Sequence, residues 1–290
     1  MEILPGVYSL PAPVRKTKSS FRNYQPPNVY LVKGNECALI DSGYGDKRSI
    51  KVRLEQLREV GVSTVAYIVI THAHKDHMGG ADALRSALGG TLAAHRDDVS
   101  SADRDLAKKG RPGVGLALDD GAVLDLGGLT LRMVHTPGHA SGHLCIYLPE
   151  RKVMFSGDNV LGLGTTAIGP RRGGGMGLYL ESLRRLFDYD MEVMLPGHGP
   201  PIRSPRQKLE ELLRHREERE SQVLGLLGRG VEDAPAMLAS IYPELEEDHL
   251  KKMALRQISA HLTKLEGEGK ATGKGRGKAR RFRLVVGAAA

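Results

Sequence analysis

The chain has little cysteine and no long apolar run, and each deficit excludes a class of protein. Only two of the 290 residues are cysteines, Cys37 and Cys145. Both lie in apolar, strand-like runs, so we expect buried thiols and no disulfide framework of the kind that supports small secreted proteins. No uninterrupted apolar stretch approaches the roughly 20 residues of a membrane-spanning helix.

A secretory signal is also missing from the first residues. Residues 1 to 5 read MEILP and lack the basic start and the apolar segment that such a signal needs. We therefore expect a cytoplasmic protein that does not enter a membrane.

Positive charge is what the chain has in excess. Its formal net charge is +8, which permits polyanionic substrates without requiring them. Seven basic residues and no acid lie between Lys270 and Arg283. Such a run is usually a solvated surface, but it can also contact nucleic acid, and both interpretations stay open here.

The densest chemical motif is the segment 72–77, which reads HAHKDH. Three imidazoles and a carboxylate within six residues are hard to explain as packing, and both groups bind divalent transition metals. Alternate residues share one face of an extended chain, so His72 and His74 can grip one ion together. After a turn, Asp76 and His77 can face a second ion.

Three later pieces add further ligand types. His139 follows Thr136-Pro137-Gly138, Asp158 follows Phe155-Ser156-Gly157, and His198 lies in a glycine-proline turn. Short β-like runs precede them, over residues 129–134, 153–155 and 192–195. Ligands placed where strands end can converge at one rim of a sheet, where α/β folds commonly place their sites.

This order of residues, HxHxDH and then His139, Asp158 and His198, resembles the metallo-β-lactamase superfamily over about residues 5 to 200. The resemblance implies a four-layer αβ/βα sandwich, whereas periodicity alone predicts only a mixed α/β fold. It also implies that His72, His74 and His139 hold one metal, that Asp76, His77 and His198 hold another, and that Asp158 bridges both. Asp41, in the sequence Asp41-Ser42-Gly43, matches an aspartate that supports the first histidine pair, although a turn residue is the simpler interpretation.

The sequence around Asp158 and the tail narrow the resemblance to the β-lactamase-like-protein-2 group. That group carries a C-terminal winged-helix domain and includes an endoribonuclease that acts on single-stranded RNA. Residues 206–228, 234–241 and 249–265 show helical patterns and precede the basic segment, which reads as a hairpin. We expect a catalytic domain over residues 1–204 and a winged-helix-like domain over residues 205–290. Residues 99–118 are polar and predict no clear element.

The resemblance implies a two-metal hydrolase in which Asp158 lies close to a bridging hydroxide and Asp76 orients this nucleophile. Zinc is the first expectation for the ions, and iron or manganese can occupy such ligands. His143 lies four residues after His139 and could donate to a developing charge on the substrate, although a backbone-bonded strand histidine is the simpler interpretation. Arg171 and Arg172, in a glycine-rich loop, could bind a phosphate or only form a mobile lid.

The favoured substrates are phosphodiesters such as RNA, and broad, promiscuous hydrolysis is compatible with the site. Lactones, thioesters and other esters compete within the same class, as in glyoxalase II or lactonases, because the same nucleophile attacks carbon or phosphorus. A nucleic-acid-binding protein with a vestigial hydrolase fold is the alternative class, and the full set of seven ligand positions argues against it. The sequence leaves a homodimer open.

Overall fold

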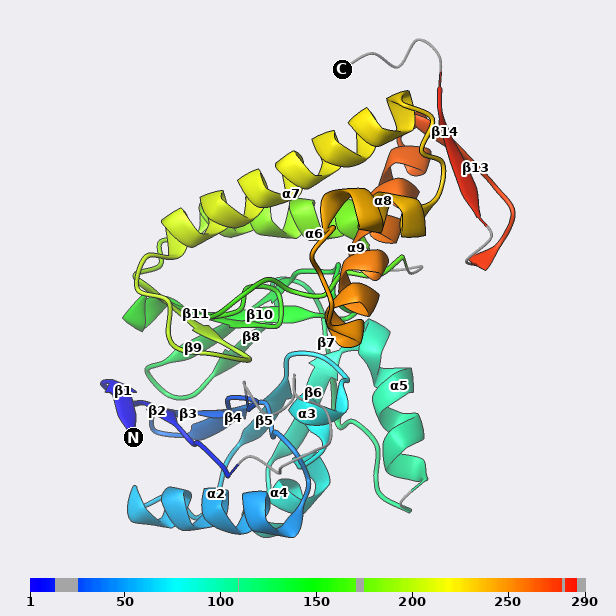
Figure 1. Cartoon of the computed structure of the whole chain (residues 1–290). Helices are drawn as coiled ribbons and strands as arrows, with labels where there is room; N and C mark the ends of the chain where they lie inside the picture. Colours follow the sequence, from blue (N-terminus) through cyan, green and yellow to red (C-terminus); the bar gives the residue numbers. More distant parts are fainter. Residues whose placement is uncertain (14–25, 109, 171–174, 278–279, 286–290) are drawn as a thin grey trace.

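The structure is a computed structural model and describes residues 1–13, 26–108, 110–170, 175–277 and 280–285. The predictions made for Arg171 and Arg172 lie outside the described residues. Two β-sheets lie face to face between outer layers of helices (Figure 1), so the predicted four-layer sandwich is confirmed.

The first sheet has seven strands that follow one another in chain order. The pairings from β1 to β4 are antiparallel and those from β4 to β7 are parallel. Its strands are β1 (Glu2–Leu4), β2 (Val7–Ser9), β3 (Tyr30–Lys33), β4 (Cys37–Ile40), β5 (Tyr67–Ile70), β6 (Thr91–His95) and β7 (Leu116–Leu118). Helices on its outer side are α2 (Lys47–Glu59), α4 (Ala81–Leu88) and α5 (Arg96–Ala107), and the short α3 (Lys75–Met78) lies beyond the end of β5.

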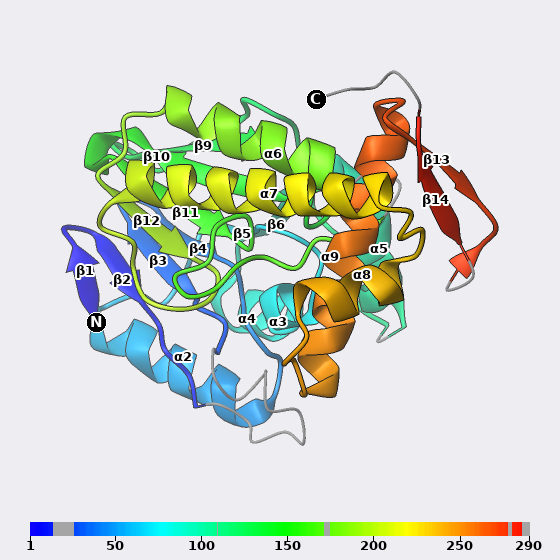
Figure 2. The same cartoon turned by 45° about the horizontal axis from the view of Figure 1, so that its top comes forward.

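The second sheet has five strands in the order β12-β11-β10-β9-β8. Only the β11–β12 pairing is parallel. Its strands are β8 (Val123–Asp125), β9 (Thr130–His135), β10 (Leu144–Leu148), β11 (Val153–Gly157) and β12 (Val193–Pro196). Helix α6 (Met176–Arg185) and helix α7 (Pro205–Gly228) lie across its outer face, as Figure 2 shows from above.

Alternation of apolar side chains explains why the first sheet is buried on both faces. In β5, Val69 faces the core between the sheets, whereas Ile68 and Ile70 pack against the outer helices. Successive side chains of a strand point to opposite faces, so a continuous apolar run serves two cores at once. The same run leads directly into the HxHxDH segment.

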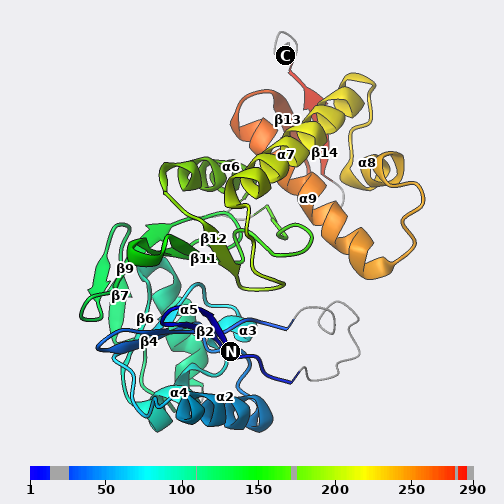
Figure 3. The same ribbon diagram turned by 90° about the vertical axis from the view of Figure 1, so that its left-hand side faces the viewer.

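The C-terminal region contains the predicted helices and hairpin. Helices α8 (Ala234–Ile241) and α9 (Asp248–Gly267) are followed by strands β13 (Ala271–Lys274) and β14 (Arg281–Leu284), which pair antiparallel. These elements lie beside the upper half of the sandwich (Figure 3). No helix in the described part of the chain is long and apolar enough to cross a bilayer.

Helix α7 takes part in two hydrophobic cores. Its first half packs Leu209 and Leu212 into the cluster under α6, and its second half packs Val223 and Leu226 into the core of the C-terminal region. The domain boundary predicted between residues 204 and 205 therefore coincides with the start of a shared helix.

One part of the fold was missed from the sequence. Residues 99–118, for which no element was predicted, contain most of α5 and all of β7. Helix α5 buries only Asp98, Ala102 and Leu106, so its apolar stripe is too sparse to stand out in a polar segment.

Candidate metal centre

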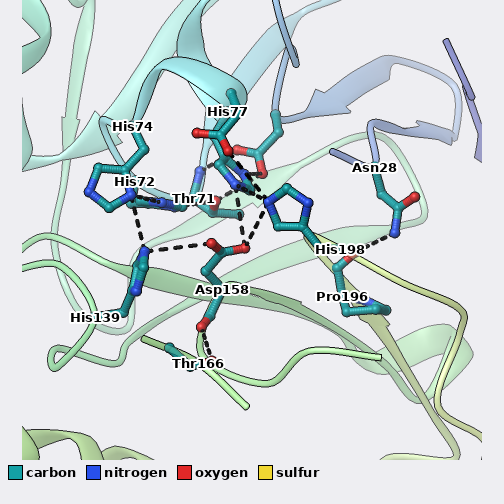
Figure 4. Close-up of polar contacts among 12 residues, drawn as sticks. Asn28, Thr71, His72, His74, His77, His139, Asp158, Thr166, Pro196 and His198 are labelled. Atoms are coloured by element: carbon teal, nitrogen blue, oxygen red, sulfur yellow. Dashed lines mark hydrogen bonds and ion pairs between the residues drawn. The ribbon is translucent and has the colours of Figure 1, made fainter. Parts of the chain in front are cut away.

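The seven predicted ligands come together where strands of both sheets end. β5 leads into Thr71 and the HxHxDH segment, β9 into the loop with His139, β11 into Asp158 and β12 into His198. Figure 4 shows the labelled members of this set, His72, His74, His77, His139, Asp158 and His198, facing one another. Segments that are far apart in the chain thus contribute to one cluster.

The first group is formed by three imidazoles. The distance from His72 Nε2 to His74 Nδ1 is 2.8 Å, and the distance from His139 Nε2 to His74 Nδ1 is 3.0 Å. Nitrogens this close are arranged as ligands around one point, and these residues form a group that could hold a metal ion.

The second group contains Asp76, His77 and His198. His77 Nε2 lies 3.2 Å from His198 Nε2, and His198 Nε2 lies 3.6 Å from Asp76 Oδ2. His77 is fully buried, whereas the Asp76 side chain is partly exposed. This group therefore opens toward solvent on the side of Asp76.

Asp158 lies between the two groups and faces both. Its Oδ2 is 3.5 Å from His139 Nε2. Its Oδ1 is 3.4 Å from His77 Nε2 and 3.6 Å from His198 Nε2. Among the described residues, the buried Oδ1 accepts no hydrogen bond. A buried carboxylate oxygen without a donor is costly unless a cation compensates it, so this position fits a metal ion.

Gly197, directly before His198, keeps the space beside Asp158 open. A Cβ atom at this position would lie 2.6 Å from Asp158 Oδ1 and 2.7 Å from His77 Cε1. Both distances are shorter than a van der Waals contact. A residue with a side chain would therefore crowd the place where the carboxylate and imidazole converge.

The direction of the pKa shift differs between the two ligand groups. Burial and the neighbouring His139 lower the pKa of His74 to about 4, and burial with the surrounding imidazoles lowers the pKa of His72 well below its usual value. Burial also lowers the pKa of His77, but the carboxylates of Asp158 and Asp41 outweigh it and raise the pKa well above its usual value. Neutral imidazole is the form that binds metal, so the first group has the required form at neutral pH.

Asp41 holds the HxHxDH segment through contacts to Thr71 and His77. Its Oδ2 lies 2.7 Å from His77 Nδ1, and its Oδ1 accepts a hydrogen bond of 2.7 Å from the Thr71 backbone N–H. Asp41 has a φ of 61°, a left-handed conformation that is strained for a residue other than glycine. The contact orients His77 Nε2 toward the centre, as expected for an imidazole that ligates a metal.

Two supporting residues were missed from the sequence. Asp98, at the start of α5, accepts hydrogen bonds from the Ala73 N–H at 2.8 Å and the Gly142 N–H at 3.2 Å. Asn28 donates its side-chain amide to Pro196 O at 2.9 Å and to Gly199 O at 2.8 Å. Both fix ligand-bearing loops, but neither belongs to a motif, because their partners are distant in the chain.

His143 lies against the backbone of Asp158. Its Nε2 accepts a hydrogen bond of 3.0 Å from the Asp158 N–H, and its Nδ1 lies 2.9 Å from Thr136 Oγ1. Burial lowers the pKa of His143 well below its usual value. Since both nitrogens are engaged, the contacts favour a role in positioning Asp158. The donor role expected from the sequence stays a prediction.

A polar cavity of about 280 Å³ opens beside the first group. The residues that line it include His74, His139, Arg104 and Ser141. A ligand in this cavity can reach His74 and His139 of the cluster.

A further set of ligand types, His95, Asp97 and His135, lies near this cavity but is arranged differently. The rings of His95 and His135 stack at 3.9 Å with an interplanar angle of 10°. Parallel stacked rings cannot both point a lone pair in plane at one ion, and His135 Nε2 already lies 2.7 Å from Ser141 O. We do not interpret this set as a metal site.

Comparison with known families agrees with this geometry. Residues 22–198 match the metallo-beta-lactamase superfamily, and residues 234–279 match the beta-lactamase associated winged helix domain. The chain belongs to the metallo-β-lactamase superfamily. The prediction of an enzyme of this superfamily with a C-terminal winged-helix domain is confirmed.

Curated relatives cover different shares of the chain. The lactamase-like protein adaB of Aspergillus niger is 35% identical over 207 residues, which is 71% of this chain and 60% of the relative. The atrochrysone carboxyl ACP thioesterase of Emericella nidulans is 31% identical over 259 residues, which is 88% of this chain and 79% of the relative. The chain therefore spans less than two thirds of the length of the first of these relatives.

Solved structures extend the likeness to nearly the whole chain. A metallo-beta-lactamase family protein from Thermus thermophilus has a TM-score of 0.75 and 28% identity, and the match covers 98% of this chain and 100% of that one. A beta-lactamase domain protein from Burkholderia ambifaria has a TM-score of 0.81 and 23% identity, with 98% and 93% covered. The second match shows the fold alone.

Proposed function

We propose that this chain is a two-metal hydrolase whose preferred substrates are acyl thioesters and related activated esters. The observation that carries the hydrolytic centre is the position of Asp158, which shares its two oxygens between the two ligand groups. A single carboxylate placed in this way suits a pair of cations better than one.

The residues fit the two ions as follows. His72, His74 and His139 would hold the first ion, and Asp76, His77 and His198 would hold the second, with Asp158 shared. Zinc is the first choice because the set is rich in imidazole, and iron or manganese are compatible with it. When bound, such ions supply Lewis acidity, which makes water a better nucleophile near neutral pH and polarises a carbonyl group.

The carboxylates have a separate task in hydrolysis. Asp158 and the partly exposed Asp76 can accept hydrogen bonds from the attacking water and aim it at the carbonyl carbon. As the new C–O bond forms and the C–S bond breaks, the carboxylate oxygen of Asp76 that would not face the ion can hold the proton that the water loses. That proton can then pass to the departing sulfur, so that one water and one thioester give one acid and one thiol.

The leaving group favours a thioester over a phosphodiester. A thiol has a pKa of about 8.5, so its anion departs without prior protonation, whereas the far more basic alkoxide of a nucleotide benefits from a proton donor. His143 was the expected donor, and both of its ring nitrogens are engaged within the protein. The similarity to proteins named as ACP thioesterases supports the same choice.

The basic hairpin gives only limited support to RNA. Four of its cations lie within ion-pair distance of acids, in the pairs Lys270–Glu268, Arg280–Glu266, Arg281–Asp233 and Arg283–Glu232. Within the described residues, Lys274 and Arg276 make no ion pair, so two cations stay available. RNA hydrolysis is therefore the second candidate, supported by these two residues and the net charge of +8.

A direct competition of substrates tests the proposal. The purified protein, loaded with zinc or manganese, is assayed with an acyl-pantetheine thioester, the matching oxyester, an aryl phosphodiester and single-stranded RNA. We expect kcat/KM to be highest for the thioester, and we expect chelator to abolish turnover. Higher kcat/KM for RNA would replace the proposed substrate class, and turnover that resists chelator would overturn the two-metal centre.

A further inference from the structure

The loop segment Thr166–Ala167, which follows β11, contacts two of the predicted ligands. Thr166 Oγ1 donates a hydrogen bond of 2.6 Å to the backbone oxygen of Asp158 (Figure 4), and His139 Nδ1 donates one of 3.0 Å to Ala167 O. The first contact fixes the backbone that carries Asp158. The second fixes the ring orientation of His139, whose Nε2 faces the centre. One short loop segment therefore contacts the predicted ligands that follow both β9 and β11.

This segment is itself held by an arginine of α7, the helix that the catalytic sandwich shares with the C-terminal region. Arg216, in the middle of α7, is fully buried, and its Nη2 donates a hydrogen bond of 2.9 Å to Thr166 O. Its Nη1 donates to Gln257 Oε1 of α9. The guanidinium also lies 5.4 Å from the ring centre of Tyr179 in α6. Helices α7 and α9 are thus linked to this segment through the Arg216 side chain.

Stability alone gives a poor account of a buried arginine at this place. Among the described residues no carboxylate forms an ion pair with Arg216, and its Nε has no hydrogen-bond partner. Burial of a cation without a partner anion is costly, and an apolar side chain of similar volume commonly serves a core as well or better. The directed hydrogen bond to Thr166 is what an apolar side chain could not supply.

We propose that Arg216, held by Gln257, is a positioning residue that fixes the Thr166–Ala167 segment and thereby the placement of Asp158 and His139. In this role the C-terminal region fixes the geometry of the metal centre, whether or not it contacts nucleic acid. A neighbouring contact agrees with this: a Cβ atom at Gly169 would lie 3.2 Å from Nη2 of Arg256 in α9. The same stretch of chain therefore packs against α9 a second time.

The test compares arginines on one helix. Arg216→Met removes the hydrogen bonds but keeps much of the volume, and Arg216→Lys keeps the charge and one donor. Arg219→Met is the matched control, because Arg219 lies on the same helix but stacks over the Tyr242 ring at 4.5 Å and donates a hydrogen bond to Gln222 Oε1. For each variant we would measure the dissociation constant and absorption spectrum of bound cobalt(II), then kcat and KM, and the Tm of the metal-free protein.

We expect Arg216→Met to weaken cobalt binding by about tenfold, at the lower end of the effect of residues that orient ligands, and to alter the cobalt spectrum. We also expect kcat to fall with KM little changed, partial recovery in Arg216→Lys, and wild-type values in Arg219→Met. Because cobalt binding needs no substrate, this outcome does not depend on the proposed thioester specificity.

An Arg216→Met protein with a lower Tm but unchanged cobalt affinity and spectrum would show that Arg216 only packs the interface and would overturn the proposal. If that variant does not fold, Gln257→Leu and Thr166→Val each remove a single hydrogen-bonding group from the same path. Weakened cobalt binding in both would support the proposal, and unchanged cobalt binding in both would overturn it.

Discussion

Charged and titratable side chains gather in two regions of this chain, and the two regions differ in how these side chains are paired. At the C-terminal hairpin, Arg280, Arg281 and Arg283 lie against acids of the same region. At the strand ends, imidazoles face imidazoles, and Asp158 Oδ1 has no hydrogen-bond donor among the described residues. The hairpin is locally neutralised, whereas ligand-type atoms of the strand-end cluster face one another across its centre.

The difference separates two features that look alike in the sequence. The basic run is the more conspicuous concentration of charge in the sequence. Most of its described cations form ion pairs near the surface, and such pairs contribute little to stability. The histidine cluster gathers ligand atoms that a pair of positive ions would satisfy together. Charge that is left unmatched in a buried place is the better indicator of function, and the predictions below test both sides of this comparison.

Loss of the shared carboxylate should have the largest effect. Asp158→Ala removes the group that faces both ligand sets, so we expect turnover to fall by more than the roughly 100-fold typical for loss of a supporting residue, and bound metal to fall below two ions per chain. Metal analysis and kcat measurements check this. The control Asp190→Ala removes an exposed aspartate paired with Lys152 and should change neither value. Full activity of Asp158→Ala would contradict the proposed centre.

Asp41→Asn should have the next largest effect. The variant keeps the shape of the side chain but weakens its acceptance from His77 Nδ1, so we expect metal affinity to fall by about 10- to 100-fold. Titration with a chelator measures it, and Asp46→Asn, which disturbs only the N-cap of α2, serves as control. Equal affinities in both variants would show that Asp41 does not orient His77.

The C-terminal region should lose stability in acid through Glu220. Burial alone would raise the pKa of Glu220, but hydrogen bonds from His261 and Lys264 outweigh it and lower the pKa to about 2 from 4.5. The carboxylate therefore stabilises the fold above pH 4.5, and this contribution is lost as the pH falls toward 2. At neutral pH we expect Glu220→Gln to cost on the order of 2–3 kcal/mol.

Denaturant unfolding of Glu220→Gln and the wild type at several pH values measures the contribution. The gap between the two should narrow below pH 4.5, and a gap independent of pH would contradict the role of the ionised carboxylate. Glu218→Gln is a suitable control, because the side chain of Glu218 is largely exposed in its pair with Arg214.

The smallest effect is expected at the hairpin. Replacement of Lys274 and Arg276 by serine removes the two described basic residues of the run without an ion pair, and thioester turnover should stay within about twofold. The plot of log K for RNA binding against log salt concentration should become less steep by at most about 1.4, the value for two lost single-strand phosphate contacts. A collapse of RNA cleavage in this variant would instead assign the hairpin to substrate capture.

The sequence predicted which seven side chains come together, but of the residues that support them it indicated Asp41 and missed the others. His72, His74, Asp76 and His77 form a compact motif, and the family resemblance ordered the remaining three ligands around them. Arg216 gives no such signal, because a charged residue within a charged helix looks solvent-exposed until packing places Thr166 O next to it.

Helices show the same limit. The winged-helix elements were predicted from their apolar stripes, but α5 was missed because it buries so few apolar side chains. Its Asp98 then supports two ligand loops through contacts that span 25 and 44 residues of chain. Such contacts depend on tertiary structure and leave no periodic pattern in the sequence.

The two cores that share α7 have a consequence for how the molecule comes apart. Leu212 and Val223 lie on one continuous helix but are held in different apolar clusters, so melting either cluster exposes side chains that the other needs. We expect heat to unfold the chain in a single cooperative step. A break at its midpoint would then give no free-standing catalytic fragment, because the cut would strip a covering helix from the second sheet.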